Sequence, residues 1–282
     1  YEPAECGVAA RRLRRKGSRL NPPPGQTLPQ SVARCAPLAM THLAAINCLG
    51  AGRAELLAAM RAQRSGLAPC DFDTADLPTY IGRVAGLDDF QVAAQLSDYD
   101  CRNNRLAQWC LEQDGFTAAV RDACTRYGAE RIGVFVGTST SGILETELAY
   151  RRRDAQSGAL PADFRYAQVH NTFSVGDFVQ RYLGLGGPAF VVSSACSSSS
   201  KVFGNAARMI AAGICDAAVV GGVDSLCLTT LYGFHSLGLT STQACRPFDA
   251  ERNGISIGEG AGFVLLEKAR PGAGAVCLLG VG

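Results

Sequence analysis

Cys196 is the residue whose type and position most directly suggest chemistry. It stands in "FVVSSACSSSSKVFGNAARMIAAG" (190–213), between an apolar run and a helical pattern, with four serines directly behind it. A helix N-terminus offers free amide groups and a positive dipole end, and both favour the thiolate, the nucleophilic form of cysteine. We therefore expect Cys196 to be a nucleophile, and we expect the serine hydroxyls to satisfy amides at the start of the helix.

A simpler interpretation is that Cys196 is one more small buried residue among twelve cysteines, since free cysteine is among the most buried residue types. His170 precedes it by 26 positions and is a candidate for lining the same pocket, although an ordinary, partly exposed histidine is the plainer interpretation. An ordinary structural or surface role is also the plainer interpretation for the other histidines and two lysines, namely His42, His235, Lys201 and Lys268.

Two elements must position Cys196: a strand through Ser194 and a helix over 197–212, closed by Gly213. Further strands are expected at "RIGVFVGTS" (131–139), "DAAVVGGVDS" (216–225), "GAGFVLLEKA" and "AVCLLGVG". Helical patterns follow or precede several of them, as in "SGILETELAYRRR" and "DFVQRYLG". The succession of strand, small-residue turn and helix predicts an α/β fold.

The first third of the chain gives weaker signals. "THLAAINCLGAG" favours a strand and a glycine turn, and "RAELLAAMRAQRSG" favours a helix ended by Gly66. Residues 103–128 predict one long helix, or two helices with a break at Gly115. Residues 67–100 are rich in turn signals, so they receive no assignment.

Composition separates a basic start from an apolar body. Residues 1–39 carry seven Lys and Arg against two Glu, while the whole chain has a net charge of +2 and is 47% hydrophobic. We expect 1–39 to be a basic, disordered tail or upstream extension and 40–282 to be one large domain. An RNA-binding arm is the alternative for 11–19, but the net negative remainder gives no general reason to bind nucleic acid.

Several classes of site have no support. The cysteines form no CxxC pair and no Cys/His cluster, which disfavours a metal site and favours reduced thiols in a cytoplasmic protein. No apolar run is long enough for a membrane span. "GLGGP" (184–188) and "GEGAG" (258–262) lack the spacing of a dinucleotide-binding loop, so we expect no cofactor and read both as close-packed backbone.

Four segments resemble the β-ketoacyl-[acyl carrier protein] synthases, which are condensing enzymes of the thiolase superfamily. These segments are "RIGVFVGTSTSG", "GPAFVVSSACSSS", "AARMIAAGICDAAVVGGVDS" and "ACRPFDAERNGISIGEGAGFVLLEKA". The resemblance runs from about Thr41 to Gly282, and its most specific parts are the Ala-Cys-Ser turn and the "RPFD…ERNG…GEGAG" block. It implies the first, N-terminal half of the duplicated, layered thiolase-like fold.

By this resemblance Cys196 accepts an acyl group as a thioester, and its backbone amide can supply one oxyanion donor. A malonyl thioester then loses carbon dioxide and attacks the acyl group in fatty acid, polyketide or aryl-polyene synthesis. The implied partners are an acyl carrier protein and a second subunit, in a homodimer or heterodimer formed through the strand 189–195.

The chain departs from this family in the groups that would assist decarboxylation. The family takes two histidines, a lysine and a turn containing glycine and phenylalanine from the second half of the fold, and no histidine here has a His-Gly-Thr context. Asn253 also stands where the family block often has aspartate. Open alternatives are a thiolase-type or chalcone-like enzyme, a non-catalytic dimer-forming partner, and an inactive half-domain. The motifs leave acyl chain length, starter unit and pathway open.

Overall fold

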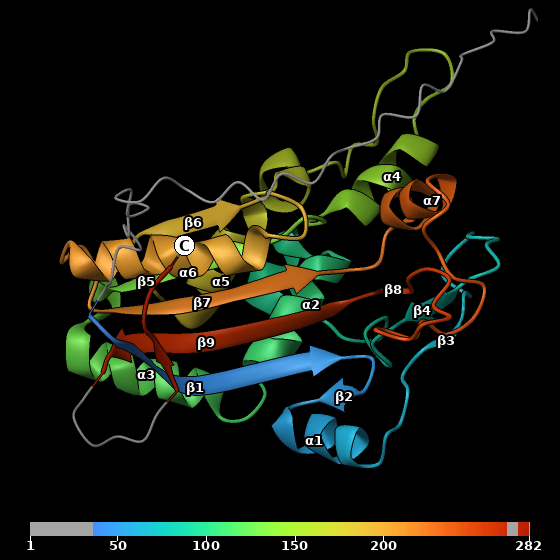
Figure 1. Ribbon diagram of the computed structural model, residues 1–282. Coiled ribbons are helices and arrows are strands. Elements are labelled where there is room, and N and C mark those ends of the chain that lie inside the picture. Colours follow the sequence, from blue (N-terminus) through green and yellow to red (C-terminus); the bar gives the residue numbers. More distant parts are fainter. Residues whose placement is uncertain (1–35, 270–275, 282) are drawn as a thin grey trace, which may run out of the picture. The chain divides into compact units, whose positions relative to one another are not determined.

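A computed structural model describes residues 36–269 and 276–281, which form a seven-stranded sheet, a small three-stranded sheet and helices around them (Figure 1). The strands of the large sheet are β1 (Leu38–Asn47), β2 (Gly50–Ala51), β5 (Ile132–Gly137), β6 (Ala189–Val192), β7 (Ala217–Asp224), β9 (Gly260–Lys268) and β10 (Cys277–Leu278). The small sheet contains β3 (Ala68–Pro69), β4 (Tyr80–Gly82) and β8 (Ile257–Gly258).

Seven α-helices and three short helical segments lie in the described part of the chain. The α-helices are α1 (Arg53–Arg61), α2 (Arg102–Leu111), α3 (Phe116–Tyr127), α4 (Ile143–Arg151), α5 (Ser174–Leu183), α6 (Ser198–Ala211) and α7 (Leu228–Ser236). The short segments are η1 (Ala94–Tyr99), η2 (Ala129–Arg131) and the π-helix η3 (Tyr166–His170).

The strand directions bring the carboxyl ends of four strands to one edge of the large sheet. The order is β10-β1-β9-β7-β5-β6; β5 is parallel to β6 and β7, while β9 is antiparallel to both β7 and β1. Strands β1, β5, β6 and β7 therefore end on the same side, toward the right in Figure 1. Ligand sites of open α/β sheets lie at such carboxyl ends.

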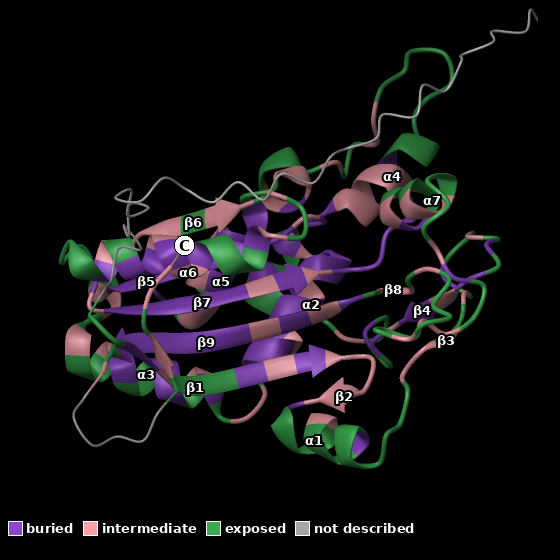
Figure 2. Cartoon of the chain, in the orientation of Figure 1, coloured by how far each residue is buried: buried purple, intermediate pink, exposed green. Residues whose placement is uncertain are grey.

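The large sheet is buried on both faces, and this explains its apolar, β-branched sequence. Along β7, Val219 and Val223 pack with residues of α2, α3 and α5, whereas Ala218 and Val220 pack with α6. Figure 2 shows this central region as the most buried part of the molecule. Each fully buried valine, leucine or isoleucine contributes about 1.5–3 kcal/mol, so the sheet provides a rigid support for its carboxyl edge.

The predicted elements of the second half are largely confirmed, with shorter strands at two places. β5, β7 and β9 lie where the buried-strand patterns predict, and α6 ends just before Gly213. The strand before Cys196 ends at Val192, not Ser194, and "AVCLLGVG" contributes only the two-residue strand β10. The sequence reading gave no helix over 228–236, where α7 lies.

In the first half, the alternative with two helices is correct, because Gly115 adopts φ 72° between α2 and α3. The prediction that Gly66 ends α1 is wrong. The helix ends at Arg61, and Gln63 then takes a positive φ of 51°, which is incompatible with a continuing helix. Gly66 is needed for a close approach, since a Cβ there would lie 2.3 Å from the carbonyl oxygen of Cys48.

Two expectations concern segments at the limits of the described chain. The basic tail proposed for 1–39 falls outside the described residues except for 36–39, and β1 begins at Leu38. Over the described ranges, the structure contains no helix that is both long and apolar enough to span a membrane.

Candidate active site

Cys196 lies in the five-residue link between β6 and α6, and it is exposed. The interpretation of Cys196 as one more buried cysteine is therefore wrong. The preceding residue, Ala195, has φ 54°, a left-handed conformation that is uncommon for a residue with a Cβ and is often found at functional sites. The chain thus makes a sharp turn at Ala195 and presents the Cys196 thiol to solvent.

The serines around Cys196 hold this turn together. The Ser198 hydroxyl donates to the carbonyl of Ala195 (2.6 Å) and accepts the amide of Ser194 (2.9 Å), and the Ser198 amide also donates to Ala195 (3.0 Å). The Ser197 hydroxyl donates to the carbonyl of Ser194 (3.0 Å). The expectation that serine hydroxyls cap the helix amides is wrong, because Ser197, the N-cap of α6, makes no side-chain cap. The hydroxyls bind the turn instead.

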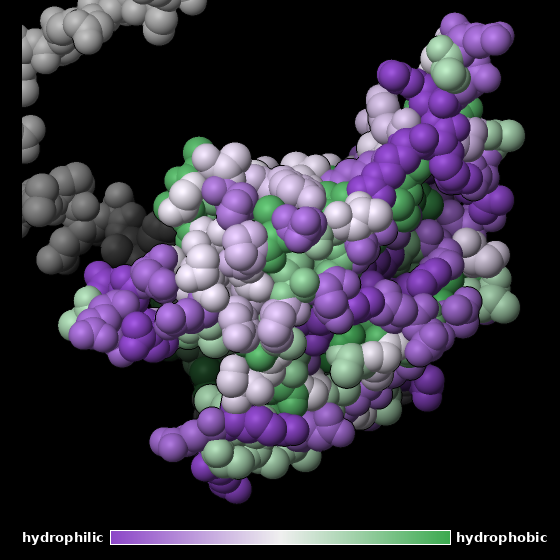
Figure 3. Space-filling view, turned by 90° about the vertical axis from the view of Figure 1, so that its right-hand side faces the viewer, coloured by the Kyte–Doolittle hydropathy of each residue, from purple (hydrophilic) through white to green (hydrophobic). Residues whose placement is uncertain are grey.

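A single carboxylate connects the ends of β5 and β7 next to this link. The Oδ1 atom of Asp224 accepts the backbone amides of Ser139 (2.6 Å) and Thr140 (3.1 Å), as well as both hydroxyls. The Thr140 hydroxyl also accepts the amide of Ser225 (3.0 Å). Because β5 lies between β6 and β7, the cross-link stiffens the edge that carries Cys196. Figure 3 faces this side and shows hydrophobic residues set between hydrophilic ones.

The sequence reading missed Asp224, since the contact joins residues 85 positions apart. The available signal was an aspartate at the end of a buried strand, where a charged side chain requires partners.

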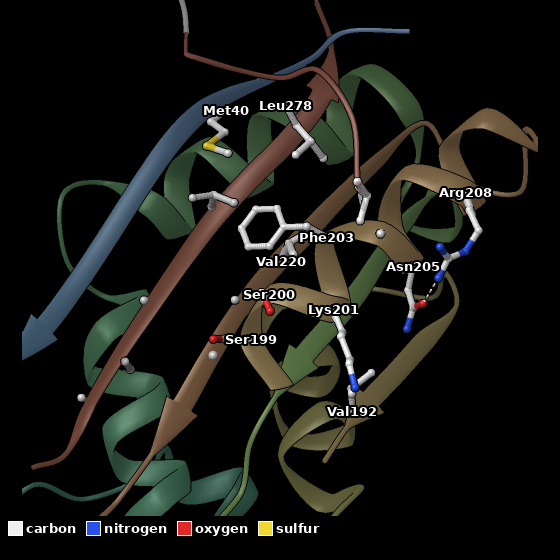
Figure 4. A pocket seen from close by; sticks show the side chains of 18 of the residues that line it. Met40, Val192, Ser199, Ser200, Lys201, Phe203, Asn205, Arg208, Val220 and Leu278 are labelled. Atoms are coloured by element: carbon white, nitrogen blue, oxygen red, sulfur yellow. Dashed lines mark hydrogen bonds between the residues drawn. The ribbon is translucent and has the colours of Figure 1, made fainter. Parts of the chain in front are cut away.

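A groove of about 1110 Å³ is lined by residues of α6 and of the large sheet (Figure 4). Ser199 and Ser200, three and four residues after Cys196, line it together with Lys201. Farther along, its lining is apolar, and in Figure 4 the ring of Phe203 lies near Val220 and Leu278. The groove therefore has a polar region at the first turn of α6 and an apolar region beyond it.

The three histidines lie outside the turn that carries Cys196. The Nδ1 atom of His170 is 2.7 Å from the Thr146 hydroxyl, and its ring stacks on Phe164. Burial lowers the pKa of His170, so it is neutral at pH 7. His235 pairs with the Thr240 hydroxyl (2.9 Å), and His42 is exposed on β1. Within the described residues, no hydrogen bond joins a histidine to Cys196.

The two lysines occupy the expected positions, and a metal site has no ligand set in the described chain. Lys201 is exposed on α6, and Lys268 is the exposed last residue of β9. Over residues 36–269 and 276–281, no group of three or more His, Cys, Asp or Glu side chains could hold a metal ion.

The two glycine-rich motifs are close-packed in part, since an added Cβ would lie 3.1 Å from the carbonyl oxygen of Ile46 at Gly260 of "GEGAG" but meets no atom within 4 Å at Gly184 of "GLGGP". In "GLGGP", a Cβ at Gly187 would lie 2.2 Å from the carbonyl oxygen of Ile132. In "GEGAG", Glu259 is buried and pairs with Arg102 through two bonds of 2.7 Å each. The Asn253 side chain accepts the Ser241 hydroxyl (2.6 Å), which gives this departure from the aspartate pattern a structural role.

Comparisons with known proteins agree with the geometry. A family model described as "Beta-ketoacyl synthase, N-terminal domain" matches residues 39–271. Nodulation protein E of Rhizobium meliloti (strain 1021) is 30% identical over 237 residues, covering 81% of this chain and 57% of that protein. The 3-oxoacyl-[acyl-carrier-protein] synthase 2 of the same strain is 35% identical over 145 residues, covering 48% and 34%. The chain thus spans little more than half the length of the first of these relatives and about a third of the second.

Two solved structures extend the similarity to three dimensions. A ketosynthase in complex with its chain length factor from Xenorhabdus doucetiae has a TM-score of 0.72 at 31% identity, covering 84% of this chain and 59% of that one. A β-ketoacyl synthase from Burkholderia phymatum STM815 has a TM-score of 0.70 at 26% identity, covering 86% and 62%. The expectation of the first half of a layered, thiolase-like α/β fold is confirmed.

Proposed function

The chain belongs to the β-ketoacyl synthase family, whose N-terminal domain it contains, and we propose that it acts in the decarboxylative Claisen condensation of an acyl thioester with malonyl-[acyl carrier protein]. The Cys196 thiolate attacks the acyl carbonyl, the carrier thiol leaves, and a thioester forms on Cys196. Malonyl thioester then loses carbon dioxide, and the resulting carbanion attacks this thioester. A carbon–carbon bond forms, the bond to sulfur breaks, and the product is a β-ketoacyl thioester two carbons longer.

One observation carries the proposal: an exposed thiol on a strained turn at the start of a 14-residue helix. The N-terminus of such a helix carries about half a positive charge, which favours the thiolate and the developing oxyanion. The hydroxyls of Ser197 and Ser198 bind within the turn, so they hold Cys196 in place without competing for its thiol. The groove beside α6 has an apolar region suited to an acyl chain.

The proposal includes an acyl carrier protein and a second subunit as partners. Among the described strands, β6 is an edge of the large sheet, and Phe190 on it is 42% exposed while stacking on Phe135 at 5.9 Å. An exposed edge with a large apolar side chain supports pairing through 189–195 with a like strand of a homodimer or heterodimer. The complex between the Xenorhabdus ketosynthase and its chain length factor supports the heterodimer.

Two further parts of the proposal concern the surroundings of the chain. The groups that assist decarboxylation come, by the resemblance, from a second half of the fold, and the open groove beside α6 supports such a covering domain.

A cytoplasmic location is supported by the buried free thiols of Cys101, Cys110, Cys215 and Cys227, which remain unoxidised in a reducing compartment. The division into a tail at 1–39 and a domain at 40–282 belongs to the same proposal.

Limited alkylation with iodoacetamide, read by peptide mass spectrometry, tests the nucleophile. Burial raises the pKa of the Cys101, Cys215 and Cys227 thiols and raises that of Cys110 to about 12, so these side chains should label slowly. We expect Cys196 to be modified first.

Transfer of a radiolabelled acyl group from acyl carrier protein tests the function itself. Cys196→Ala should abolish the protein-bound label, whereas the control Cys70→Ala should retain it. In the alkylation experiment, an unmodified Cys196 in a protein whose Cys70 and Cys245 are alkylated would make the nucleophile assignment wrong. Acyl label that survives Cys196→Ala would show that another residue accepts the acyl group, and a wild-type chain that takes up no label would favour the non-catalytic, dimer-forming partner.

A further inference from the structure

Two glycines lie directly beneath the first turn of α6. Gly137, the last residue of β5, and Gly222 of β7 are partners in the parallel register of these strands. A Cβ at Gly137 would lie 2.4 Å from both the carbonyl carbon of Ser198 and the amide nitrogen of Ser199. A Cβ at Gly222 would lie 2.6 Å from the Cβ of Ser199. Non-bonded carbon atoms normally stay about 3.5–4.0 Å apart, so only glycine permits this approach at either position.

We infer that Gly137 and Gly222 are positioning residues for Cys196, an inference that rests on the proposed role of Cys196 as the nucleophile. Their missing side chains let the backbone of Ser198 and Ser199 lie directly on the sheet. The same turn is bonded to Ala195, because both the amide and the hydroxyl of Ser198 donate to the Ala195 carbonyl. A displacement of Ser198 is therefore transmitted to Cys196 and to its oxyanion-donating amide.

The size of the effect follows from these contacts. An alanine methyl at Gly222 requires the Ser199 Cβ to retreat by about 1 Å to reach normal carbon contact. A Cβ is fixed to its backbone, so the first turn of α6 must move with it. A misplacement of about 1 Å at a reacting group can lower a rate about 100-fold. At Gly137 the obstructing atoms are backbone atoms, so a smaller neighbouring side chain cannot relieve the clash.

The neighbouring glycine in β7 provides a matched control. Successive residues of a strand point to opposite faces, and a Cβ at Gly221 would lie 2.2 Å from the carbonyl oxygen of Gly262 on β9, away from α6. Gly221→Ala thus strains the sheet without touching the turn that carries Cys196. Gly233, in α7, has no atom within 4 Å of an added Cβ and controls for the substitution itself.

The test measures how the rate of Cys196 alkylation by iodoacetamide depends on pH, in the full chain and for each variant that remains folded. We expect Gly222→Ala to slow the alkylation of Cys196 by at least tenfold. Ser199→Gly removes the clashing Cβ, so the alkylation profile of the double variant should return to that of the Ser199→Gly single variant. Gly221→Ala should lower the thermal midpoint but keep the wild-type profile, and Gly233→Ala should keep both.

A wild-type profile in folded Gly222→Ala, or a double variant that is not restored, would overturn the inference. If Gly222→Ala alone does not fold, the comparison is between Ser199→Gly and the double variant: equal profiles support the inference, and unequal profiles contradict it. A wild-type protein in which Cys196 labels no faster than the other cysteines would instead remove the proposed function on which the inference rests.

Discussion

Removing the carboxylate of Glu259 should destabilise the protein strongly, because this group is fully enclosed and four donors depend on it. Its side chain is 0% exposed and that of Arg102 is 6% exposed. The Arg102 guanidinium donates to both carboxylate oxygens at 2.7 Å, and the amides of Val84 and Leu226 donate at 2.9 and 3.0 Å. These bonds join α2 and the segments that follow β4 and β7 to the residue between β8 and β9.

Breaking one side of a buried ion pair costs about 3–5 kcal/mol, and each buried amide left without an acceptor adds about 1–3 kcal/mol. Arg102 keeps a bond to Asp88, so Glu259→Ala should cost about 5 kcal/mol, a large part of the stability of a typical domain. The measurement is urea unfolding followed by far-ultraviolet circular dichroism.

The matched control is the exposed pair between Arg152 and Asp163, whose side chains are 56% and 61% exposed. Asp163→Ala should leave the free energy of unfolding almost unchanged, because solvent screens such a pair. If Glu259→Ala unfolds within about 1 kcal/mol of this control, the argument that Glu259 fastens these segments together is refuted.

Three other outcomes follow from the same contacts. Burial raises the pKa of Glu145 from 4.5, so its ionisation destabilises the native state increasingly as the pH rises from 4.5 through the native pKa. The melting temperature of Glu145→Gln should rise relative to that of wild type over this pH range. A difference in melting temperature that does not change with pH would contradict this. Asp224→Asn, which weakens the acceptor for four donors of Ser139 and Thr140, should cost about 1–3 kcal/mol in urea unfolding. Phe190→Asp should convert the proposed dimer to monomer in light scattering, whereas an unchanged mass would exclude pairing through β6.

Elements with a single strong pattern were predictable from the sequence. The buried strand β7 is an unbroken run of small and β-branched residues, and α6 shows Val202, Ala206 and Ile210 at helical spacing before Gly213. The end of α1 was misplaced because Gly66 is an obvious stop signal. The helix actually breaks before it, at Gln63, whose positive φ cannot be predicted from a glutamine side chain.

The site was only partly predictable. The residues that present Cys196 are adjacent in sequence, whereas the residues that support them from the sheet are not. Cys196 could be chosen from its own neighbours, since the strand and helix that present it are adjacent in sequence. The support beneath it joins distant residues: Asp224 is 85 positions from Ser139, and Gly222 is 85 positions from Gly137. A single sequence shows such pairs only as unrelated small or acidic residues.

The roles of the serines illustrate a further physical limit. A serine behind a strand–helix junction has two uses for its hydroxyl: it can cap the amides of the helix or bond the turn before it. Capping requires an N-cap with extended backbone angles, but Ser197 has φ −94° and ψ 1°, because the left-handed Ala195 has already turned the chain. The hydroxyl of Ser198 is thereby directed back to Ala195. The choice was decided by the backbone conformation of one alanine.

This arrangement separates the proposed reaction into two parts with different structural requirements. Acyl loading needs a thiolate, an oxyanion donor and space for the acyl chain, and the proposal assigns the first two to Cys196 and the third to the groove beside α6. Decarboxylation needs donors aimed at an enolate, but in the described chain His170 and His235 bond to threonine hydroxyls and His42 faces solvent. Under the proposal, loading therefore depends on the rigidity of the sheet edge beneath α6, whereas condensation depends on groups brought to the open side of the groove.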